Sequence, residues 1–113
     1  MTSAEVAIER RGGTVVAHLS GEVDMTNSAR VREELLVSVP NDALALVIDL
    51  DGCRYLDSAA IEVLFDLARR LGRRRQELRL VLPPSSPLSR VLTLTDVGSV
   101  AEVHETLDSA LGE

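Results

Sequence analysis

Residues 43–72 read ALALVIDLDGCRYLDSAAIEVLFDLARRLG, and this stretch decides the fold. Ala43 to Leu50 is a nearly unbroken apolar run between polar residues, which is typical of a strand covered on both faces. From Ile61 onward, apolar residues recur at the i, i+3, i+4, i+7 spacing of a helix with one buried face. Gly72 is expected to cap the end of that helix. The stretch therefore predicts a central strand followed by a helix.

The residues before this stretch predict a β-hairpin and another helix. Residues 5–10 alternate in polarity, residues 14–19 are rich in β-branched side chains, and two glycines lie between the two segments. Residues 26–39 carry apolar side chains at helical spacing, and the proline that follows stops the helix. Thr26 or Asn27 is the expected cap of this helix.

The residues after the stretch alternate again between strand and helix. Residues 78–82 are a strand that two prolines end, and residues 86–98 predict a short helix. Residues 100–103 are expected to form an edge strand, and Thr106 is expected to cap a terminal helix. The order predicts an α/β domain with a mixed sheet and right-handed parallel crossovers.

Length and composition limit the classes of protein to consider. A chain of 113 residues, 45% of them hydrophobic, suits one globular domain over residues 1–113, with Ile48 and Phe65 in its core. The net charge of −6 argues against a nucleic-acid partner. No apolar run is long enough to enter and span a membrane, and no signal peptide is recognisable, so a cytoplasmic protein is expected. The lone Cys53 and the two separated histidines predict neither a disulfide nor a metal site, and no cofactor motif is present.

Ser58, between Asp57 and the predicted second helix, has three interpretations. Ser and Asp both cap helices, so the pair needs no function. A hydrolytic nucleophile would need a base and a sharp turn such as GxSxG, and neither is recognisable around it. A phosphorylation site is also compatible, because the free NH groups and dipole of a helix N-terminus tolerate a phosphate. The physical chemistry of the position alone leaves the first and third open.

Two segments of the sequence resemble a known family, and this resemblance favours the phosphorylation site over a simple helix cap. LSGEVDMTNSARVREEL, residues 19–35, and VIDLDGCRYLDSAAIEVL, residues 47–64, resemble the STAS-domain anti-sigma factor antagonists of bacterial partner-switching systems. The family's G-E-(L/I/V)-D loop is matched by residues 21–24, and its D-S-(S/T)-G-L motif is matched by residues 57–61. The resemblance continues through SSPLSRVLTLTDVG, residues 85–98, to Thr106.

The resemblance implies a fold, a function and a set of site residues. The fold would be a single STAS-like domain, with a mixed, mostly parallel sheet of about five strands and helices mainly on one face. The unphosphorylated protein would bind an anti-sigma factor that is also a serine kinase and so release the sigma factor. Phosphorylation of Ser58 would switch it off, and a serine phosphatase would reset it. The protein would be a substrate and not an enzyme, and partner-binding residues would be Gly21, Glu22, Asp24, Thr26, Asp57, Ala59 and Ala60.

The chain departs from the family motif at two positions. Ala59 and Ala60 stand where the family has a second hydroxyl and then glycine, so Ser58 is the only hydroxyl there and Ala60 adds a methyl where a partner could approach. Some STAS domains lack the phosphorylation switch and serve as adaptors in transporters or lipid-trafficking complexes. That is the alternative function.

Two charged features have simpler explanations. Five arginines between residues 69 and 75 fall at the end of a predicted helix, where cations complement the dipole, and no aromatic residue interleaves them. We interpret them as a solvated basic rim. Asp24 and Asp57 alone are not expected to hold Mg²⁺, because the ion in kinase reactions arrives with the nucleotide.

Overall fold

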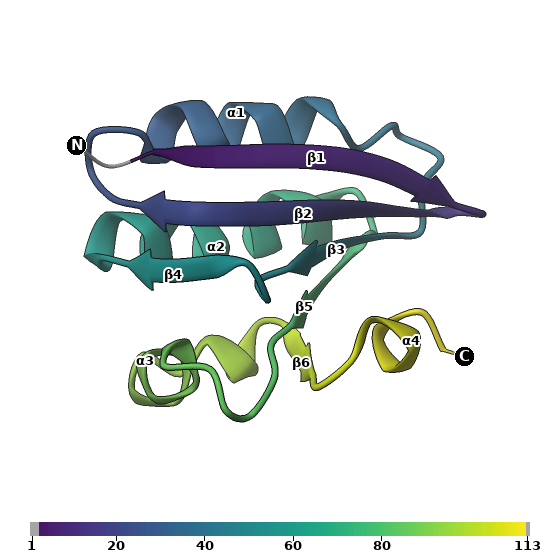
Figure 1. Cartoon of the computed structure of the whole chain (residues 1–113). Coiled ribbons are helices and arrows are strands. Elements are labelled where there is room, and N and C mark those ends of the chain that lie inside the picture. The colour runs from purple at the N-terminus through teal and green to yellow at the C-terminus, as the bar shows by residue number, and fades with distance from the viewer. Residues whose placement is uncertain (1–2, 113) are drawn as a thin grey trace.

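The computed structural model describes residues 3–112, whose strands form one six-stranded sheet (Figure 1). Helices α1 and α2 lie along one face of the sheet, while the short α4 lies apart from them near the C-terminus (Figure 1). The elements in chain order are β1 (Ala4–Arg11), β2 (Thr14–Val23), α1 (Ser28–Val37), β3 (Ala45–Asp49), β4 (Cys53–Leu56), α2 (Ser58–Arg73), β5 (Glu77–Val81), α3 (Leu88–Leu94), a 3₁₀ turn (Val97–Ser99), β6 (Glu102–His104) and α4 (Leu107–Ala110).

The strands run in the order β1-β2-β3-β5-β6, with β4 beside the end of β2. Only the β1/β2 pair is antiparallel, and the other pairs are parallel. This confirms the predicted α/β class with a mixed, mostly parallel sheet. The hairpin turn contains Gly12, whose φ of 62° is the left-handed conformation that such tight turns require.

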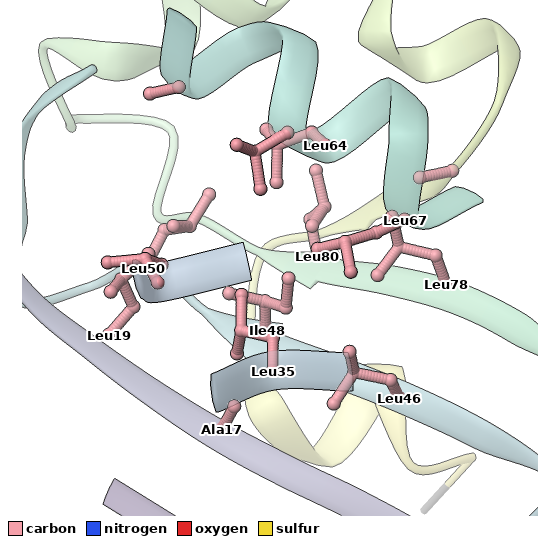
Figure 2. Packing of buried hydrophobic residues seen from close by; sticks show 14 of the residues in the cluster. Ala17, Leu19, Leu35, Leu46, Ile48, Leu50, Leu64, Leu67, Leu78 and Leu80 are labelled. Carbon is pink, nitrogen blue, oxygen red and sulfur yellow. The ribbon is translucent and has the colours of Figure 1, made fainter. Parts of the chain in front are cut away.

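The central strand β3 is covered on both faces, as its apolar sequence predicts. Leu46 and Ile48 are fully buried and pack with Leu35 of α1 and Leu67 of α2 (Figure 2). Val47 points to the opposite face, where it packs in a smaller cluster that includes residues of α4. Burial on two faces explains why no polar residue interrupts the strand.

One strand is not predicted by the sequence analysis. Residues Cys53–Leu56 form β4, which pairs only with the last three residues of β2. Its four residues do not alternate in burial, because Arg54 and Tyr55 are both exposed. Its pairing with β2 shifts register between Gly21 and Glu22, where Arg54 is the extra residue on β4, so the strand lacks the alternation by which a sequence pattern is recognised.

Two expectations about α2 are wrong. Gly72 does not cap the helix, which continues to Arg73 and closes after Arg75 has taken a left-handed φ of 59°. Phe65 is only partly buried against the core, because it lies at the rim of the buried face, whereas Leu67 is completely buried.

The other predicted elements are confirmed with small changes of boundary. Helix α1 starts at Ser28 behind Asn27, and the edge strand β6 begins two residues later and ends one residue later than expected. Thr106 caps α4, since its hydroxyl accepts a hydrogen bond from the Ser109 NH at 3.1 Å. No helix within residues 3–112 is long and apolar enough to cross a membrane.

Candidate functional site

The end of β2 is shaped by Gly21. Its φ of 92° is a left-handed conformation, and a Cβ built on it would lie 2.2 Å from the Ser3 carbonyl oxygen. Gly21 NH donates to the Gly52 carbonyl at 3.1 Å, and Glu22 NH donates to the Ser3 carbonyl at 2.9 Å. Only glycine allows the two backbone segments to lie this close without displacing Ser3. Gly21 therefore has a structural role, which is to aim the following residues toward β4.

The loop after β2 is folded on itself by side-chain hydrogen bonds. Asp24 Oδ1 accepts from the Thr26 NH at 2.9 Å and from the Thr26 hydroxyl at 2.5 Å. Asn27, which is buried, accepts from the Asp24 NH and donates to the Glu22 carbonyl, both at 3.0 Å. The Asn27 side chain thus holds the loop and does not cap α1, although it occupies the cap position.

Asp57 joins this loop to the start of α2. Its Oδ1 caps the helix by accepting from the Ala60 NH at 2.9 Å. Its Oδ2 accepts from the Met25 NH at 2.9 Å, across 32 positions of sequence. The Asp57 NH donates to the Val23 carbonyl at 3.2 Å. One carboxylate therefore fixes both the loop and the helix N-terminus, and the two segments of the sequence resemblance meet at this residue.

Ser58 is the first residue of α2 and is exposed. Its hydroxyl makes no hydrogen bond with any residue between 3 and 112, so it is free to react with a partner. The free NH groups and the positive end of the α2 dipole lie beside it, while Asp57 and the loop acids supply negative charge. The position can accept a phosphate without repacking the core, but the added charge would lie next to the Asp57 carboxylate.

One of the expected partner-binding residues differs from the others in exposure. Ala60 is buried, at 2% relative exposure, whereas the others are partly or fully exposed. The expectation that the Ala60 methyl faces a partner is wrong, because it points into the core. Met25 was missed by sequence reasoning, although its side chain is 78% exposed at the tip of the loop that Asp57 holds. A single apolar residue in a polar loop has no periodicity that would have revealed it.

The groups that could support nucleophilic chemistry are engaged elsewhere. The His18 ring lies 2.8 Å from Asp49 and 3.1 Å from Glu9, and the His104 ring lies 2.8 Å from the Ser109 hydroxyl. Burial raises the pKa of the Cys53 thiol, so the sulfur stays protonated at neutral pH. Within residues 3–112 no three His, Cys, Asp or Glu side chains converge in a way that could hold a metal ion.

A groove runs from this site between α1 and α2. It has a volume of about 480 Å³, and its lining includes Ser28 and Arg32 of α1 and Ala59 and Glu62 of α2. The groove continues the surface on which Ser58 lies, so a partner that covers Ser58 can also contact both helices. The site thus combines an exposed hydroxyl with a neighbouring groove between two helices.

Comparison with known proteins gives consistent results. The model of the STAS domain family matches residues 5–110. The anti-sigma-F factor antagonist RsfA of Mycobacterium tuberculosis is 29% identical over 110 residues, covering 95% of this chain and 84% of RsfA. The anti-sigma-B factor antagonist of Listeria monocytogenes is 27% identical over 95 residues, covering 84% of this chain and 82% of the relative. A crystal structure of an anti-sigma factor antagonist from Mycobacterium paratuberculosis superposes with a TM-score of 0.85 at 27% identity, covering 97% of this chain and 92% of the other.

Proposed function

The chain belongs to the STAS domain family, and we propose that residues 1–113 form one such domain that acts as an anti-sigma factor antagonist in the cytoplasm. In its unphosphorylated form it binds an anti-sigma factor that is a serine kinase, and this binding releases the sigma factor. The kinase phosphorylates Ser58, and a serine phosphatase restores the active form. The protein is a substrate in this cycle and catalyses no step.

The observation that carries the proposal is the double hydrogen bond of Asp57. It holds the Met25 loop against the N-terminus of α2 and leaves the Ser58 hydroxyl exposed beside that loop. A kinase must reach the hydroxyl, and a binding partner must recognise the surface around it. One rigid surface therefore serves both for binding and for modification. We assign Glu22, Asp24, Thr26, Asp57 and Ala59 to it, together with Met25.

The chemistry of the switch follows from charge. The transferred phosphoryl group replaces the hydroxyl proton of Ser58 and carries nearly two negative charges at neutral pH. The N-terminus of α2 stabilises these charges within the fold. Across the interface they lie near Asp57 and Asp24 and must be desolvated when a partner binds. Phosphorylation should therefore leave the fold intact and weaken the complex.

The test is phosphorylation with purified cognate kinase and ATP. We expect one phosphate per chain, at Ser58, measured by intact mass and peptide mapping, and none in Ser58→Ala. Phosphate on Thr26 or Tyr55 instead would contradict the assignment. Stable binding to a transporter or lipid-trafficking subunit, with no phosphorylation by any partner kinase, would favour the adaptor function.

A further inference from the structure

A second surface lies at the opposite end of α2. Arg70, Arg73 and Arg74 line a groove of about 450 Å³ together with Glu33, Leu36 and Val37 of α1. We call these six residues the arginine groove. Fifteen helical steps lead from Ser58 to Arg73, so Arg73 lies roughly 22 Å along α2 from the phosphorylation site. The two surfaces therefore cannot be covered by one short segment of a partner.

The arginine groove carries positive charge that the protein itself neutralises only in part. Within residues 3–112, Asp66 forms ion pairs with Arg69 and Arg70, whereas Arg73 and Arg74 have no ion pair. Arg74 reaches only the Val39 carbonyl and the Asn41 side chain, each at 3.4 Å. The carbonyl groups at the end of α2 attract cations, but they require no run of consecutive arginines. On a chain with a net charge of −6, this concentration of unpaired guanidinium groups is a local exception.

The arginine groove also contains exposed apolar side chains. The side chain of Val37 is 74% exposed on the last turn of α1, and Leu36 beside it is only partly buried. A solvated rim would not need an apolar residue between its charges. Guanidinium groups on the α2 side of an apolar patch match an occupant that presents carboxylates next to an apolar side chain.

We propose that the arginine groove binds an acidic segment of a partner protein, with carboxylates on Arg73 and Arg74 and an apolar side chain on Val37. Protein is favoured over nucleic acid because the chain is acidic as a whole and neither Tyr55 nor Phe65, its two aromatic residues, lines the groove. This surface goes beyond the proposed function, because binding here does not require the Ser58 hydroxyl.

The test uses a short fluorescein-labelled peptide of alternating glutamate and leucine, titrated into the full chain and followed by anisotropy and by backbone amide shifts. We expect the shifts to fall on residues 33–37 and 70–75. Arg73→Glu/Arg74→Glu should weaken binding roughly tenfold or more, and Arg73→Gln/Arg74→Gln and Val37→Ser should each weaken it severalfold. Thermal melts will show that the glutamine and serine variants remain folded, since all three side chains are exposed.

The matched control is Arg10→Glu/Arg90→Glu. These two arginines are exposed, lie on other elements and have no ion pair within residues 3–112, and the change in net charge is the same. Peptide affinity should change less than about twofold in this variant. An equal loss in both charge-reversed variants would overturn the proposal. So would amide shifts centred on residues 24–26 and 57–59, or tighter binding of a short DNA duplex than of the peptide.

Discussion

Gly21 shows how one residue determines the position of the site. The Ser3 carbonyl occupies the space that a side chain would need, and φ is left-handed as well. Gly21→Ala should therefore lower the free energy of unfolding by more than the roughly 1 kcal/mol expected for the backbone conformation alone. Gly12→Ala is the control, because Gly12 also has a positive φ but nothing lies within 4 Å of its added Cβ. Urea unfolding of both variants measures the difference, and equal losses would show that the contact with Ser3 does not matter.

A substitution at Asp57, compared with one at another helix cap, separates the loss of helix stability from the loss of the site's geometry. Asp57→Ala removes a helix cap, at a cost of about 0.5 to 2 kcal/mol, and also releases the Met25 NH. We expect it to lose binding to the anti-sigma kinase. Thr106→Ala removes a comparable cap from α4 and should retain binding. Calorimetric titration of each folded variant with the kinase measures its affinity. Full affinity in Asp57→Ala would mean that the Met25 loop is not part of the interface.

At the scale of the elements, the end of α2 has a glycine and an arginine in unfavourable places. The glycine lies inside the helix, and the arginine takes the capping conformation that suits glycine. Gly72 lies in the last turn with nothing within 4 Å of an added Cβ, and Arg75 takes the left-handed position that usually belongs to glycine. The Arg75 NH donates to the Gly72 carbonyl and the Gln76 NH donates to the Leu71 carbonyl, which is the Schellman arrangement.

Gly72→Ala should therefore stabilise the protein by up to about 1 kcal/mol, because alanine favours the helix. Arg75→Gly should also stabilise it, by a few tenths to about 1 kcal/mol, since it removes the left-handed strain. Melting temperatures of the two single variants and of the double variant measure this. A lower melting temperature for Arg75→Gly would show that the Arg75 side chain contributes more than its backbone costs.

The same element explains why sequence reasoning succeeded in part. The period of the apolar residues predicts α2 and its buried face, and the residue pair Asp57 and Ser58 predicts where it begins. The predicted end at Gly72 is wrong, because the helix continues to Arg73 and the chain turns only at Arg75, after which the Gln76 side chain donates to the Pro40 and Ala43 carbonyls. Sequence also could not show β4, which depends on a backbone register shift, or the exposed Met25.

Side chains from three adjacent strands meet at His18. The protonation of its ring makes the stability of the fold depend on pH. Burial lowers the pKa of His18, but hydrogen bonds to Asp49 on β3 and Glu9 on β1 outweigh it, so this pKa lies above its ordinary value. A raised pKa contributes stability that is fully present below the unfolded value near about 6.5. That contribution is lost as the pH rises through the folded pKa.

The free energy of unfolding should accordingly fall as the pH rises through about 6.5 and above, with the largest slope between the unfolded and the folded pKa of His18. His18→Gln should remove this slope, and His104→Gln should retain it. Urea unfolding across the pH range, with an NMR titration of the His18 ring, measures both quantities. A slope that persists in His18→Gln would assign the effect to another group.

At the scale of the whole molecule, α2 separates two surfaces of opposite character. Ser58 follows the Asp57 carboxylate at one end, and the arginine groove lies at the other. A charge added at Ser58 is therefore far beyond a Debye length from the arginines and acts on the near surface alone. Partner binding at the Ser58 surface should respond to this charge while peptide binding at the arginine groove does not.

The comparison of Ser58→Ala with Ser58→Asp tests this arrangement. Two phosphate charges at about 8 Å from one carboxylate, with an effective dielectric near 20, repel by roughly 4 kcal/mol before screening. Half of that already weakens affinity more than about tenfold. Ser58→Asp adds one charge on a shorter side chain, so it should bind the kinase measurably less tightly than the wild type, whereas Ser58→Ala should bind about as well.

Both variants should melt near the wild-type temperature, because Ser58 is exposed and an acid is favourable at the start of α2. The measurement is a titration of each variant against the kinase with nucleotide present, alongside thermal melts. Reduced kinase affinity of Ser58→Asp with an unchanged melt assigns the effect to interfacial charge, since unfolding would lower both. Equal kinase affinity of Ser58→Asp and wild type would mean that charge at Ser58 does not control the complex, and the adaptor function would then explain the exposed hydroxyl better.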